Sequence, residues 1–215
     1  MKPTIQLKHF FFAMFILAVV NAAGCDTTGR ERAKEATTSM QTMENEIKSV
    51  AMQLDATGVS LEALMRPGQP DVKKAFALYT ENVSKMEDWE KSFAKHADEM
   101  KARGKDYFEE WQKEGNTYKN PRIQELSDQR RLELGEIYGR IAETSIGVRD
   151  AFKTYVSNAK EAQNYLSNDL TPNGIEAFAR IGRKVVQDGD NLKYAIRNVQ
   201  NAIATARTEM TQGGR

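Results

Sequence analysis

Few side chains in this sequence have the chemistry that an enzyme or a metal site needs. The chain has two histidines, His9 and His96, and one cysteine, Cys25. Zinc sites draw on several placed histidine or cysteine side chains, a nucleophilic triad would need His96 as its base, and a di-iron helical bundle needs Glu-x-x-His on two helices. Phe93 stands three residues before His96, so the di-iron pattern is missing. We interpret His96 as a half-exposed helix residue.

The remaining candidates for catalysis are carboxylates, and their spacing favours a solvated surface. Glu109, Glu110 and Glu114 fall near one helical turn, where charged residues usually form the water-facing side of a helix. The sequence has neither the Gly-rich loop that binds phosphates nor the Gly-x-Ser-x-Gly turn that carries a serine nucleophile. We therefore predict no catalytic residue, no metal site and no cofactor.

Cys25 follows a segment with the layout of a secretory signal peptide. Lys2 and Lys8 precede an unbroken apolar run at 10–20, and small residues occupy 22–24. That order is typical of a signal peptide, and the run is shorter than the about 20 apolar residues that a membrane-spanning helix needs. Ordinary cleavage after residue 22 would leave Cys25 as a free thiol near the N-terminus.

The sequence Ala-Ala-Gly-Cys at 22–25 resembles the lipobox of bacterial lipoproteins, although Ala22 stands where that motif usually has Leu, Val or Ile. The resemblance implies that residues 1–24 are removed, that the Cys25 sulfur carries a diacylglycerol, and that residues 25–29 tether the chain to a membrane. Two or three acyl chains make a stable anchor. We then expect the protein in the bacterial cell envelope, facing the periplasm, with the choice between inner and outer membrane open.

The charge balance argues against nucleic acid and against acidic lipid headgroups as main partners. The chain has 31 Lys and Arg against 30 Asp and Glu, and removing Lys2 and Lys8 with the signal peptide leaves 29 basic residues and a net charge of −1. A near-neutral chain has no strong field to gather phosphates. We expect an envelope protein as the partner instead.

Prolines and apolar spacing divide the rest of the chain into four helices. Gln69-Pro70, Asn120-Pro121 and Thr171-Pro172 each have the pattern of a capping residue followed by a first-turn proline. Between these turns apolar residues recur every three or four positions. The predicted seams include Ile47 in the first segment, Ile196 in the fourth, and Ile123, Leu126, Ile137 and Thr144 in the third. The pattern predicts helices at about 30–65, 70–115, 121–167 and 172–210, with a frayed tail at 211–215.

Helices of this length need mutual packing, since the mean helix in globular proteins has about 11–12 residues. An apolar repeat of 3.5 residues is typical of a coiled-coil seam. We predict an all-α fold with one domain at 30–210, either an elongated antiparallel four-helix bundle or two coiled-coil hairpins in series. Gly104, Gly182 and Gly189 fall on seam positions, where they either make room for close packing or line a ligand slot.

Aromatic residues crowd the turn between the second and third helices, namely Tyr107, Phe108, Trp111 and Tyr118. They either seal the end of the bundle or form a contact surface, since aromatic residues are enriched at interface hot spots. At 1.5 Å per residue the two middle helices are about 15 Å longer than the outer two. Their turn should therefore project past its neighbours at the end nearer Cys25, and we predict that this aromatic tip is the contact site.

Short stretches across the chain carry a further likeness: Phe108 to Trp111, Tyr118 and Asn120, the Arg130-Arg131 pair, and the segment from Tyr165 to Leu170. They resemble a bacterial family of signal-bearing, often lipobox-bearing helical proteins known as a domain of unknown function. The resemblance implies an envelope location and a helical fold, and it brings no catalytic residues.

These patterns favour a non-enzymatic, lipid-anchored envelope protein that serves as a structural or protein-interaction module. Two alternatives stay open, a periplasmic ligand-binding or sensory bundle and a chaperone-like clamp. An apolar pocket walled by Gly182 or Gly189 would favour ligand binding, whereas a filled core would favour the scaffold. The oligomeric state is not set by the sequence.

Overall fold

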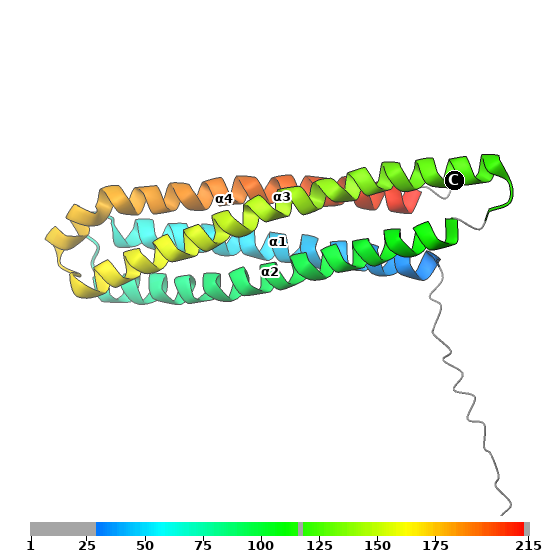
Figure 1. Cartoon of the computed structure of the whole chain (residues 1–215). Helices are drawn as coiled ribbons and strands as arrows, with labels where there is room; N and C mark the ends of the chain where they lie inside the picture. The colour runs from blue at the N-terminus through cyan, green and yellow to red at the C-terminus, as the bar shows by residue number, and fades with distance from the viewer. Residues whose placement is uncertain (1–28, 116–117, 213–215) are drawn as a thin grey trace, which may run out of the picture.

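The computed structural model describes residues 29–115 and 118–212, and these form an all-α, antiparallel four-helix bundle (Figure 1). The helices are α1 (Gly29–Leu64), α2 (Val72–Gly115), α3 (Pro121–Asn168) and α4 (Pro172–Gln212). No strand occurs among the described residues. The predicted fold class is confirmed. The predicted signal peptide at 1–24 and the lipidation site Cys25 lie outside the described residues.

The packing order decides between the two predicted architectures. Along the rod, α1 packs on α2, α2 on α3, α3 on α4, and α4 back on α1, whereas the diagonal pairs α1–α3 and α2–α4 make no close contact. Each helix therefore has two neighbours, and all four surround one core. The molecule is a single bundle rather than two hairpins in series.

Capping side chains set where the helices begin. The Asn120 side chain accepts a hydrogen bond from the backbone N–H of Arg122 at 3.0 Å, and Thr171 Oγ1 accepts one from Gly174 at 3.2 Å. These two predicted caps are confirmed. The third is wrong, because α2 begins at Val72 and Asp71 Oδ1 accepts the hydrogen bond from the backbone N–H of Lys74 at 2.9 Å. A carboxylate is a better cap than a glutamine side chain.

The buried faces follow the predicted seams over most of the rod. Ile47 of α1 and Ile196 of α4 are each 1% exposed. On α3 the seam is displaced, since Tyr138 and Ser145 are buried there whereas the sequence pattern favoured Ile137 and Thr144. The hydrogen bond from the Tyr138 hydroxyl to the backbone carbonyl of Met100 supports this arrangement.

The α2–α3 turn and the start of α1 lie at the same end of the rod, with the end of α4 nearby (Figure 1). The first turns of α3 project past the other helices there, as the helix lengths predict. The α1–α2 and α3–α4 turns lie at the opposite end. Within the described ranges, no helix combines the length and the apolar character needed to cross a membrane.

Candidate functional site

The start of α3 carries exposed apolar side chains at the end of the rod where the described chain begins. Tyr118, Ile123 and Leu126 are 44%, 48% and 67% exposed, and we call these three residues the α3 tip. The sequence pattern placed Ile123 and Leu126 in a seam. They are exposed because α4 ends before it reaches them. Arg130, one turn further along α3, bonds to the carbonyl of Glu209 in the last turn of α4. Beyond that point α4 does not cover them.

The other predicted tip residues are partly buried. Tyr107, Phe108 and Trp111 form a cluster on α2, in which the Tyr107 ring lies 5.0 Å from Phe108 and 5.6 Å from Trp111, centre to centre, both edge to face. Trp111 Nε1 donates a hydrogen bond to Ser127 Oγ of α3 at 3.0 Å. The Phe108 ring lies 5.7 Å from the Tyr138 ring of α3, so Phe108 and Trp111 join α2 to α3, while Tyr118 is exposed. A contact role for the four aromatics stays a prediction.

The basic side chains around the α3 tip fall into two groups. Arg130 and Arg131 hold the base of the tip, since Arg130 bonds to the α4 carbonyl at 2.8 Å and Arg131 pairs with Asp128 at 3.1 Å. Lys119 and Arg122 are exposed and form no ion pair within the described residues. Two cations without an ion pair therefore lie beside the exposed apolar side chains, together with the exposed carboxylate of Glu125.

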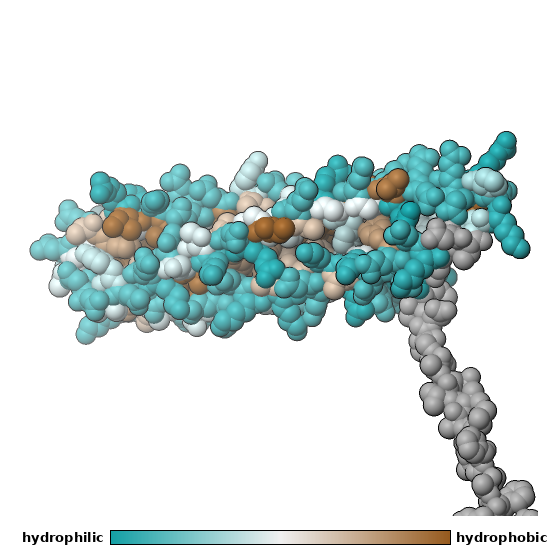
Figure 2. All heavy atoms as spheres, viewed as in Figure 1, coloured by the Kyte–Doolittle hydropathy of each residue, from teal (hydrophilic) through white to brown (hydrophobic). Residues whose placement is uncertain are grey.

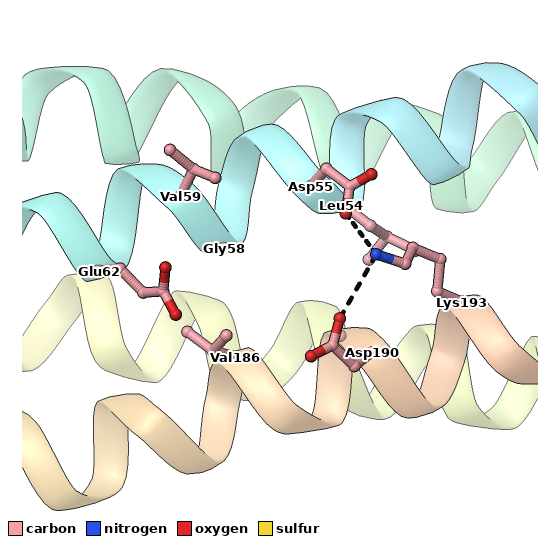
Figure 3. A pocket seen from close by; sticks show the side chains of 9 residues that line it. Leu54, Asp55, Gly58, Val59, Glu62, Val186, Asp190 and Lys193 are labelled. Atoms are coloured by element: carbon pink, nitrogen blue, oxygen red, sulfur yellow. Dashed lines mark hydrogen bonds and ion pairs between the residues drawn. The ribbon is translucent and has the colours of Figure 1, made fainter.

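A shallow cleft of about 160 Å³ lies between α1 and α4. Gly58 and Gly189 line it and have no side chains to fill it. Figure 3 shows Lys193 reaching between Asp55 of α1 and Asp190 of α4. The hydrogen bond that Lys193 Nζ donates to Asp55 Oδ1, together with the neighbouring acidic charges, holds the pKa of Lys193 above its usual value. The cleft opens to solvent, and the ion pairs already satisfy its one cation.

The seam glycines adjoin filled space. A side chain on Gly189 would meet the Tyr155 ring, whose Cε2 would lie 3.0 Å from the new Cβ. A side chain on Gly182 would overlap the Met65 sulfur and the Phe178 ring. At both positions the neighbouring side chains occupy the room that the glycine provides. The apolar slot expected for a ligand-binding bundle is absent from these two positions.

A larger groove of about 300 Å³ lies between α3 and α4, toward the end opposite the α3 tip. Its apolar lining includes Tyr165, Phe178 and Ile181, and the first two rings stack with centres 5.3 Å apart. Its charged members are Glu161, Lys184 and Asp188. Figure 2 shows apolar surface exposed near this end, over α3 and α4. Sequence reasoning missed this groove, because its exposed apolar residues, Tyr165 and Ile181, lie at the margins of two separate seams.

His96 is 25% exposed, and its Nδ1 donates a hydrogen bond to Oε2 of Glu46 on α1, whose side chain is 4% exposed. No sequence pattern indicates this pair, since Glu46 lies beside the apolar seam. Over the described part of the chain, no three His, Cys, Asp or Glu side chains gather as metal ligands do.

Comparison of the sequence with models of known protein families, and of the chain with characterised proteins and solved structures, finds no match.

Proposed function

We propose that this chain is a lipid-anchored protein of the bacterial envelope that acts without catalysis, as an interaction module held away from the membrane. The observation that carries the proposal is that the segment after Cys25 enters the rod at one of its two ends. Helix α1 begins at Gly29, at one end of the bundle, only four residues after Cys25. The opposite end is far away, since the 48 residues of α3 extend about 72 Å at 1.5 Å per residue. Acylation at Cys25 would therefore present the distal end to the periplasm.

The α3–α4 groove supports contact with a protein partner. Its apolar lining lies between charged residues, which is the usual anatomy of a protein interface. Tyr165 adds an amphipathic aromatic ring that is 42% exposed, and such rings are enriched at interface hot spots. An unidentified envelope protein is the partner we propose.

The filled glycine positions favour this function over the ligand-binding and sensory alternative. Small-molecule sites are mostly concave, apolar and preformed. Tyr155 fills the space at Gly189, and the nearby cleft is lined by Asp55, Asp190 and Lys193. Among the residues that the structure describes, no specific contact favours the chaperone-like clamp.

The anchor is tested by metabolic labelling with radioactive palmitate. The wild-type protein should take up label and sediment with membranes in high salt, whereas Cys25→Ser should take up none. Thr27→Ser is the matched control and should behave as wild type, because it leaves the cysteine in place. A wild-type protein that incorporates no label would contradict the lipid anchor.

The interaction is tested by a photo-crosslinking residue introduced at Ile181 and expressed in the native envelope. Tyr194 is the matched control, since it lies on the same helix and is 67% exposed, against 57% for Ile181. We expect one discrete adduct from position 181 and none from position 194. The same adducts from both positions would show that the groove is not the contact surface.

A further inference from the structure

The distance between the anchor and the bundle restricts where the α3 tip can be. Gly29 is four residue steps after Cys25, and a fully extended chain spans at most about 3.6 Å per residue. The start of α1 is therefore within about 14 Å of an acylated cysteine. The α3 tip lies at this same end and projects past α1 (Figure 1). An anchored protein must then hold the tip close to the bilayer surface.

The tip has the chemistry of a membrane interface. Ile123 and Leu126 present aliphatic side chains, and Tyr118 presents a ring with a polar hydroxyl, which suits the boundary between headgroups and acyl chains. Lys119 and Arg122 are exposed and form no ion pair within the described ranges. Cations in these positions can bind lipid phosphates.

We propose that the α3 tip docks on the headgroup region of the anchoring membrane. Tyr118, Ile123 and Leu126 enter the interface, and Lys119 and Arg122 contact the phosphates of anionic lipids. This inference rests on the proposed lipid anchor. The rod then has a second membrane contact besides the acyl chains, so its orientation relative to the membrane is restricted.

A bilayer suits this surface better than a second copy or another protein does. A stable protein interface buries about 800 Å² on each partner, whereas the tip offers three apolar side chains at the protruding end of one helix. The acyl anchor supplies the affinity for the membrane, so a few apolar side chains are enough to hold the tip there. The α3–α4 groove at the far end has no such access to the bilayer.

Fluorescence quenching in vesicles tests the proposal on the complete acylated protein. Leu126→Cys places one thiol at the tip, and Val59→Cys places one on α1 toward the opposite end, where the side chain is 64% exposed. Acylated Cys25 has no free thiol, so the dye labels only the introduced residue. Both proteins are reconstituted in phosphatidylethanolamine–phosphatidylglycerol vesicles, with and without brominated acyl chains.

We expect brominated lipid to quench the dye at position 126 and to leave the dye at position 59 unchanged. Lys119→Glu combined with Arg122→Glu should reduce the quenching at position 126. Equal quenching at the two positions would overturn the proposal. A dye at position 126 that is shielded from water but not quenched by lipid would also overturn it, since a second copy or another protein would then cover the tip.

The anchor and the docking fail separately in these measurements. If Cys25 is not acylated, palmitate labelling is absent and the wild-type cysteine itself takes the dye, which would contradict the proposed function. If Cys25 is acylated and position 126 is not quenched, the lipid anchor is correct and only the docking of the tip is wrong. Circular dichroism checks that each variant keeps the helical bundle.

Discussion

The ring of Tyr138 on α3 occupies the space beside Gly104 on α2. A Cβ on Gly104 would overlap the ring carbons and the hydroxyl of Tyr138, and that hydroxyl donates a hydrogen bond to the carbonyl of Met100. The pair therefore fixes the register and spacing of α2 and α3 near the tip. The glycine has no open cavity beside it, and its role in the described bundle is to admit a large side chain from the facing helix.

Gly104→Ala should destabilise the bundle by about 1–3 kcal/mol, because the added methyl group forces Tyr138 out of its place. Gly139→Ala is the matched control on α3. No atom lies within 4 Å of a Cβ built there, so alanine should stabilise the helix by about 0.5–1 kcal/mol. Urea unfolding followed by circular dichroism measures both. Destabilisation of similar size in the two variants would contradict the close contact.

Alkaline pH should unfold the protein because three tyrosines are buried. Burial raises the pKa of Tyr79 and of Tyr155 far above the usual value, and it raises the pKa of Tyr138 to about 12. A raised pKa in the folded state means that the neutral phenol is favoured there. The stability gained is complete below the unfolded pKa of about 10 and is lost as the pH rises above it.

The measurement is the free energy of unfolding from pH 8 to pH 12, with tyrosinate absorbance recorded in parallel. Ionisation of the buried tyrosines should coincide with the loss of the helical signal. Tyr79→Phe removes one of the three groups, so its stability should fall less steeply with pH than that of the wild type. Stability that does not change across this range would contradict the burial of these phenols.

The sequence predicted the helices and most of the core because apolar spacing and proline positions are local signals. It placed the α3 seam on Ile137 rather than on Tyr138, since both residues fit a three-or-four spacing and only the packing against Gly104 distinguishes them. It missed Asp71 as the α2 cap because Pro70 suggested an earlier start.

The candidate site was less predictable than the fold. Helix lengths indicated that the α2–α3 turn projects, and Figure 1 agrees. The exposure of Ile123 and Leu126 depends on where α4 ends relative to α3, which is a tertiary property that the apolar pattern alone does not contain. Likewise, the α3–α4 groove joins Tyr165 to Ile181 across a turn, and neither residue lies on the central seam of its helix.

Ile47→Asp and Ile196→Asp should each destabilise the bundle by several kcal/mol, because each places an unpaired carboxylate in the core. Both positions are 1% exposed, one on α1 and one on α4. Met52→Asp is the control, since Met52 lies on α1 with 66% of its surface exposed. Its effect should be within about 0.5 kcal/mol. Thermal unfolding distinguishes the two classes, and a small effect at both isoleucines would contradict the assignment of the core.

The Glu46–His96 pair joins a buried carboxylate on α1 to α2. Glu46 is buried on α1, its Oε2 accepts the hydrogen bond from His96, and its Oε1 has no hydrogen-bond partner among the described residues. A buried carboxylate is costly unless it is paired. His96→Ala should therefore destabilise the bundle by about 3–5 kcal/mol, since it leaves Glu46 without its only described partner.

Replacing both members of the pair should have the opposite effect. Glu46→Leu with His96→Leu removes the buried charge along with its partner, so the double variant should be as stable as the wild type or more stable. Arg103→Ala is the surface control, because Arg103 and Glu35 form a 3.0 Å ion pair with both side chains about half exposed, and its loss should cost at most about 1 kcal/mol. A double-mutant cycle measured by urea unfolding gives the coupling energy directly. A value near zero for Glu46 and His96 would mean that water already solvates the carboxylate, and that the two helices are held together there by apolar packing alone.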